Sequence, residues 1–156
     1  MSKLLKVFLL SAVPIVEQRG AIPLGINMYN LDPALVFLVS FLGSMLPAPF
    51  ILLLFNRIFE WMKKHKFFSK INEFIEKKID KNSAKLEKYK EIGLITFIAI
   101  PLPTTGVWTG TAVAAFLKLN FKKSMFCAAV GALISAFVLA VGFSVFPAIF
   151  SAVFGS

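Results

Sequence analysis

Two charged side chains, Glu17 and Arg19, lie two residues apart in a segment that is otherwise apolar from Val7 to Met28. A carboxylate can exchange a proton, and a guanidinium can bind a pair of anionic oxygens while it stays charged. Charged side chains inside a hydrocarbon layer face protein or a water-filled cavity, because exposure to lipid is costly. The segment therefore predicts an internal polar site at residues 17–20.

The composition is that of an integral membrane protein. Of the 156 residues, 58% are hydrophobic and 18 are phenylalanine, and the mean hydropathy is +0.80, far from the usual values of soluble domains. Segments 34–55 and 124–150 carry no charge and are each long enough to span a bilayer. The single cysteine, Cys127, and single histidine, His65, exclude an internal disulfide and a cysteine or histidine metal site. We expect no cofactor.

The net charge of +9 is concentrated in the lysine-rich segment 57–91. Its apolar residues recur at helical spacing, which predicts a basic amphipathic helix, with Ser83 capping a second short helix. The positive-inside rule places this linker in the cytoplasm. A basic surface beside anionic phospholipid explains the charge more simply than nucleic acid does, and a regulatory or partner-binding role stays open.

Segment 92–117 repeats the design of segment 4–29: a short apolar run, an interruption, and a second short apolar run. The predicted helix breaks are at Pro14, Pro23, Pro101 and Pro103, with the first two helices meeting at residues 17–20. Broken segments at corresponding positions in two halves of a chain are typical of transporters. We expect one membrane domain, 1–156, made of half 1 (1–56, with hairpin 4–29 and span 34–55), the linker 57–91, and half 2 (92–156, with hairpin 92–117 and span 124–150).

The lysines of residues 118–123 favour a particular topology. If segment 92–117 crossed the membrane completely, these lysines would lie outside, against the positive-inside rule. A re-entrant hairpin keeps them inside. The fold class we predict is an all-α integral membrane protein, an inverted repeat of two re-entrant helical hairpins each followed by a transmembrane helix. Inversion then makes segment 4–29 enter from outside and places Lys3 and Lys6 there.

Small residues recur at every fourth position of the last apolar segment, and such a row allows close helix approach. This packing seam includes Ala128, Ala132, Ala136 and Ala140. It could join the two halves of one chain or two protomers of a homodimer. We favour the intrachain use, because a chain this small must first pack its own helices.

Two motifs carry a family resemblance. Residues 17–23 read EQRGAIP and residues 101–110 read PLPTTGVWTG. The pair resembles the signatures of the putative small multi-drug export protein family, which is distantly similar to the DedA (VTT, or SNARE-associated) membrane proteins. The resemblance implies opposed re-entrant hairpins and transport in a prokaryotic cell membrane. The DedA relatives imply movement of undecaprenyl phosphate and proton-dependent drug and pH tolerance.

The chemistry of both motifs suits an anionic head group. Arg19 is the natural phosphate ligand, and half-helices 21–29 and 107–117 would point the positive ends of their dipoles at the same place. The predicted substrate-binding residues are Arg19, Gly20, Thr104, Thr105, Gly106, Trp108 and Thr109. Burial favours the neutral form of the Glu17 carboxyl and Arg19 favours its charged form, so Glu17 suits proton coupling.

Other interpretations remain open. Glu17 and Arg19 could be a buried pair that only holds the hairpin, and Pro, Thr and Gly are what any tight turn requires. Glu17 could instead be the counter-ion for small cationic drugs in an efflux protein. The seam and the basic helix could serve a membrane protein that binds partners without transporting anything. No pattern of a nucleophile with its base occurs, so we do not expect an enzyme.

Overall fold

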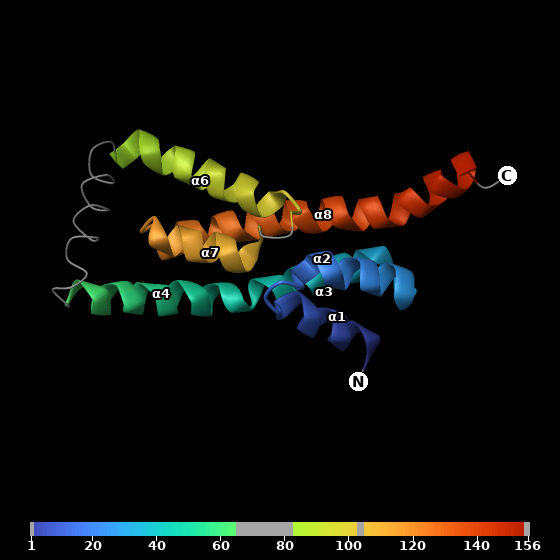
Figure 1. Cartoon of the computed structure of the whole chain (residues 1–156), viewed down its shortest axis with the longest axis horizontal. Helices are drawn as coiled ribbons and strands as arrows, with labels where there is room; N and C mark the ends of the chain where they lie inside the picture. Colours follow the sequence, from blue (N-terminus) through green and yellow to red (C-terminus); the bar gives the residue numbers. More distant parts are fainter. Residues whose placement is uncertain (1, 65–82, 103–104, 155–156) are drawn as a thin grey trace.

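The computed structural model describes residues 2–64, 83–102 and 105–154 (Figure 1). Within these ranges every regular element is a helix, as predicted. Two helical stretches, Pro33–Phe55 and Phe121–Pro147, are long and apolar enough to span a membrane. The expected all-helical fold with two apolar stretches long enough to span a membrane is therefore confirmed.

The first break lies earlier than predicted. Helix α1 (Lys3–Ala12) ends before Pro14, because proline disfavours helical backbone in the residue before it. Helix α2 (Glu17–Pro23) begins after residues 13–16, where Ile15 takes a φ of 80°. The prediction that two helices meet at residues 17–20 is therefore wrong.

Pro23 does not interrupt the helical backbone, contrary to our prediction. Helix α2 continues past Pro23 into a π-helical turn, η1 (Leu24–Met28), closed by a 3.1 Å hydrogen bond from the Tyr29 N–H to the Leu24 carbonyl oxygen. A wider turn of this kind accommodates the local disruption that a proline causes, so helical backbone is kept.

The first long apolar stretch is made of α3 (Pro33–Met45) and α4 (Pro47–Lys63). The Asp32 carboxylate caps α3 by accepting hydrogen bonds from the N–H groups of Ala34 and Leu35, at 2.9 and 3.1 Å. The two helices are separated only at Leu46, because Pro47 has no N–H for the helical ladder.

Three helices follow in the second half of the chain: α6 (Ser83–Ala99), α7 (Val107–Phe116) and α8 (Phe121–Phe154). The predicted linker, 57–91, is not a separate element where it is described, since its first residues extend α4 and its last residues, from Ser83 on, open α6. The middle of the linker, residues 65–82, lies outside the described residues.

Helices α1 and α2 lie toward one end of the long axis beside α3. Helices α6 and α7 lie toward the other end, where α7 packs against α4 and α6 packs against α8 (Figure 1). Helix α8 runs along both groups. It contributes Ala128 and Ala132 to the core around α4, α6 and α7, and Ala136 and Ala140 to the core around α1, α2 and α3. The seam thus packs within the chain and joins its two halves.

Each half uses one glycine to bring its first helix close to its long helix. A Cβ on Gly43 of α3 would overlap the carbonyl oxygen of Phe8 in α1, and a Cβ on Gly131 of α8 would lie 2.9 Å from the carbonyl oxygen of Ile95 in α6. Both contacts are with backbone atoms, which cannot move aside.

Candidate functional site

The first motif and the described part of the second motif, from residue 105 on, lie together. Glu17, 5% exposed, reaches from the first turn of α2 to the start of α7, where the Trp108 N–H donates to its Oε1 at 3.1 Å. Gly106 allows this approach, because a Cβ there would overlap the Glu17 carboxylate. A carboxylate at a helix N-terminus is stabilised by free N–H groups and by the helix dipole. Glu17 therefore caps α7 from the other half of the chain.

Arg19 is held by the second break. Its Nη2 donates to Thr105 Oγ1 at 2.8 Å, and the Thr105 hydroxyl donates to the carbonyl oxygen of Ile100 at 2.6 Å. The Leu102 N–H donates back to Thr105 Oγ1 at 3.2 Å. Thr105 thus closes the loop and positions the guanidinium.

The Arg19 charge is less compensated than that of Glu17. Arg19 Nε is buried without a hydrogen-bond partner, and among the described residues the guanidinium makes no ion pair. The Glu17 carboxylate, in contrast, is matched by the positive end of α7. Glu17 lies near enough to interact with the Arg19 charge, but the guanidinium keeps its Nε–H group without an acceptor.

Trp108 joins the two breaks through both of its N–H groups. Its backbone donates to Glu17, and its ring Nε1 donates to the carbonyl oxygen of Ala12 at 3.0 Å. Ala12 is the last residue of α1, where carbonyl groups lack partners within the helix. The ring is thus more than an interfacial side chain, since it ties α7 to the end of α1.

A cavity of about 250 Å³ lies between the breaks, lined by Pro14, Ile15, Glu17, Arg19, Thr105, Trp108 and Thr109. Of the predicted substrate-binding residues, the structure brings Arg19, Thr105, Trp108 and Thr109 to this cavity. Gly106 lies directly behind it, against Glu17. Gly20 does not line it: a Cβ on Gly20 would meet the side chain of Val16.

Two of the predicted site residues, Pro103 and Thr104, lie outside the described residues. Pro101 lies in the second break, between α6 and α7, and Pro14 lies in the first. Of these two prolines, Pro14 lines the cavity and Pro101 does not, and the charged residues that line it come from the first motif.

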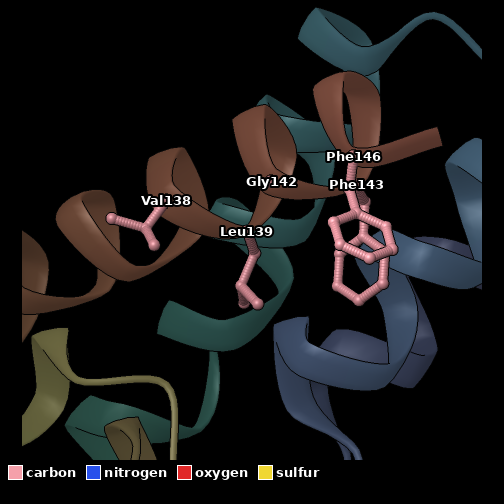
Figure 2. Close-up of a pocket in the computed structure, with 5 residues that line it drawn as sticks. All are labelled: Val138, Leu139, Gly142, Phe143 and Phe146. Atoms are coloured by element: carbon pink, nitrogen blue, oxygen red, sulfur yellow. The ribbon is translucent and has the colours of Figure 1, made fainter. Parts of the chain in front are cut away.

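A larger pocket of about 340 Å³ lies on α8, and Figure 2 shows the five residues that line it: Val138, Leu139, Gly142, Phe143 and Phe146. None of them has a charged or hydrogen-bonding side chain. This pocket can hold apolar groups, but it offers nothing that would recognise a charged one. The cavity at Arg19 is therefore the candidate site.

Gln18 is a residue that the sequence reasoning missed. It is 3% exposed, and its Nε2 donates to the carbonyl oxygen of Ala132 in α8 at 3.1 Å. The Ser44 hydroxyl of α3 lies 3.4 Å from its Oε1. The short side chain of Ala132 lets the amide reach the α8 backbone. The sequence does mark Gln18, because it is a polar residue between Glu17 and Arg19 in an otherwise apolar segment.

The fold and the site define a small all-helical membrane protein with an internal charged cavity between two helix breaks. The chain belongs to the family described as putative small multi-drug export protein, whose sequence profile matches residues 17–138. The matched range begins at Glu17 and includes both motifs, so the family resemblance is confirmed. No curated protein and no solved structure matches the chain.

Proposed function

We propose that this protein is a membrane transporter whose substrate is an amphipathic anion held by Arg19. One observation carries the proposal: Arg19 lines the cavity with a neutral threonine as its hydrogen-bond partner, while the neighbouring Glu17 is already paired with α7. A planar guanidinium binds carboxylate and phosphate oxygens in pairs. Membership of an export family supports the transport role.

The proposed topology is an inverted repeat. Helices α1–α2 and α6–α7 would be re-entrant hairpins that enter from opposite sides of a prokaryotic cell membrane, with the linker in the cytoplasm. The position of the two helix pairs toward opposite ends of the long axis supports this (Figure 1). Non-helical backbone is tolerated at membrane depth where it is buried in protein, and Thr105 satisfies such backbone at Ile100 and Leu102.

A lipid carrier with one phosphate, such as undecaprenyl phosphate, is the substrate we propose within this class. Its head group needs a cation, and its chain needs apolar walls. Arg19 supplies the first, and Pro14, Ile15 and the Trp108 ring supply apolar surface beside it. The DedA resemblance points to the same chemistry.

We further propose that Glu17 couples transport to protons. A proton on the Glu17 carboxyl removes its negative charge and weakens its hydrogen bond with the Trp108 N–H. The start of α7 is then free to bind the oxygen atoms of a substrate anion, as helix N-termini do. Binding of the anion and protonation of Glu17 would therefore favour each other, with no covalent step.

The test is binding of polyprenyl phosphate to the purified protein in nanodiscs, with polyprenol as the uncharged comparison. Arg19→Ala should lower the affinity for polyprenyl phosphate by at least about tenfold, the value of one charge-assisted hydrogen bond, and leave the affinity for polyprenol unchanged. Arg19→Lys keeps the positive charge but lacks the planar guanidinium, so it should bind polyprenyl phosphate with intermediate affinity. The control is Lys122→Gln, an exposed lysine on α8. Unchanged phosphate affinity in folded Arg19→Ala would refute the proposal.

Efflux of small cationic drugs is the second candidate. Glu17 lines the cavity together with the Trp108 ring, and a carboxylate beside an aromatic face can bind organic cations. This function predicts that Glu17→Gln sensitises cells to cationic drugs and that polyprenyl phosphate does not compete with drug binding. Competition by polyprenyl phosphate at equal ionic strength would favour the anion site.

A further inference from the structure

A second amphipathic groove lies on α1, away from the charged cavity. It has a volume of about 290 Å³ and is lined by Lys6, Leu9, Leu10, Val13 and Tyr29. We propose that this groove binds one anionic phospholipid, with the phosphate of the lipid on Lys6 and Lys3 and an acyl chain along the leucines. The proposal does not depend on what the protein transports.

Within the described ranges, Lys3 and Lys6 each contact a part of Tyr29 and no carboxylate. Lys3 Nζ donates to the carbonyl oxygen of Tyr29 at 3.2 Å, and Lys6 Nζ lies 5.7 Å from the centre of the Tyr29 ring. Neither lysine makes an ion pair among the described residues. Both ammonium groups are thus held on the same tyrosine, and their charge is available to an external anion.

The acidic residues of this part of the chain are already engaged elsewhere. Residues 2–55 contain two carboxylates, Glu17 and Asp32. Glu17 accepts from the Trp108 N–H of α7, and Asp32 caps α3. Near Tyr29 the two lysines, Lys3 and Lys6, outnumber the one carboxylate, Asp32, so the net charge there is positive. A lipid phosphate is the anion that a membrane supplies at such a position.

The rest of the groove fits a hydrocarbon chain. Leu9 and Val13 are 45% and 44% exposed; Leu9 follows Lys6 on α1, and Val13 comes directly after the last residue of α1. From Lys6 to Ala12 the helix rises about 9 Å, at roughly 1.5 Å per residue. A small soluble anion would leave this apolar surface uncovered, whereas an acyl chain attached to the phosphate covers it. A cationic end followed by an apolar floor selects an amphiphile with a negative head.

The pocket of Figure 2 provides the contrast within the same molecule. It is comparable in volume, but all five of its lining side chains are apolar or absent. Any lipid chain can fill it, whatever the head group. Preference for an anionic head group should therefore arise at the α1 groove and not at this apolar pocket.

Native mass spectrometry of the full chain, released from micelles with equal amounts of phosphatidylglycerol and phosphatidylcholine, tests the proposal. The wild type should retain phosphatidylglycerol in preference to phosphatidylcholine. Lys6→Gln should lower this preference about fivefold, the effect of one lysine near an anionic lipid surface, and Lys6→Arg should restore it. Leu9→Gln should lower the retention of both lipids at this groove.

Lys122→Gln is the matched control, since it removes one exposed lysine from α8 without touching the groove. It should leave the preference unchanged. Equal retention of the two lipids by the wild type, an unchanged preference in Lys6→Gln, an equal loss in Lys122→Gln, or full retention in Leu9→Gln would each overturn the proposal. Binding of polyprenyl phosphate at Arg19 is measured separately, so failure of one proposal is distinguishable from failure of the other.

Discussion

The two helix breaks of this molecule are built alike but carry different chemistry. The first, at residues 13–16, is followed directly by Glu17 and Arg19. The second, at residues 100–106, has no charged residue and presents Thr105 and the free N–H groups of α7. The charged groups of the first break have their hydrogen-bond partners in the second. Neither break is complete alone, so the site exists only when both halves of the chain pack together.

The scaffold around the two breaks differs much less than the breaks do. In both halves a glycine on the long helix lets the first short helix pack against it, Gly43 for α1 and Gly131 for α6. The alanines of the seam then serve both cores. Since the packing is alike, the two breaks differ chiefly in that one carries charge and the other carries neutral hydrogen-bonding groups. The following substitutions test this difference.

Gly106→Ala should have the largest effect. The new Cβ overlaps the Glu17 carboxylate, so Glu17 must leave α7 or the loop must move. Overpacking together with the lost hydrogen bond should cost about 3 kcal/mol in the free energy of unfolding. The measurement is an equilibrium unfolding titration in mixed detergent micelles followed by circular dichroism. Gly93→Ala, where a Cβ meets nothing within 4 Å, is the control and should not destabilise.

Glu17→Ala should cost about 2 kcal/mol, because it leaves the N–H groups at the start of α7 buried without an acceptor. Glu17→Gln keeps one acceptor oxygen and should cost less. Glu17→Ala also removes the group that a Cβ at position 106 would strike. The double variant with Gly106→Ala should therefore be more stable than the sum of the single effects predicts. Strict additivity would show that the two residues are not in contact.

Part of this arrangement could be predicted from the sequence. The two uncharged segments and the charged residues in the first motif are local features of composition, and the structure has helices at both segments and a polar site at the motif. The row of small residues predicted a packing seam, and the small size of the chain favoured its intrachain use. Patterns of this kind depend on neighbours within one helix, and they are visible in a single sequence.

The contacts that define the site could not be predicted in the same way. Gly20 and Pro23 suggested a break at residues 17–20, but the tertiary packing keeps them helical and places the turn at Ile15, a β-branched residue that rarely takes a positive φ. Gln18 pairs with the carbonyl of Ala132, 114 residues away. We also assigned the start of α7 to a substrate, and the structure places Glu17 there. The turn at Ile15, the Gln18 contact and the Glu17 contact all depend on how helices distant in the sequence pack together.

Thr105→Val should have a smaller effect than either change at the Glu17 contact. It removes the hydroxyl that accepts from Arg19 and donates to Ile100, for a cost of about 1 kcal/mol in unfolding free energy. Arg19 keeps its charge but is less well positioned, so polyprenyl phosphate should bind more weakly than to the wild type and more tightly than to Arg19→Ala. Thr105→Ser keeps the hydroxyl and should restore both properties. If Thr105→Val binds as weakly as Arg19→Ala, the threonine is itself a ligand.

Ser44→Ala should have the smallest effect, about 0.5 kcal/mol. The Ser44 hydroxyl is 3.4 Å from Gln18 Oε1, and it also donates to the carbonyl oxygen of Phe41 at 2.9 Å, so the bond to Gln18 is the weaker of the two. Gln18 keeps its hydrogen bond to Ala132 in this variant, and the geometry of α2 should hold. Unfolding titrations should therefore separate Ser44→Ala from Gln18→Ala, which removes the link to α8 as well. A loss in Ser44→Ala equal to that in Gln18→Ala would mean that α2 is positioned through α3 rather than through the seam.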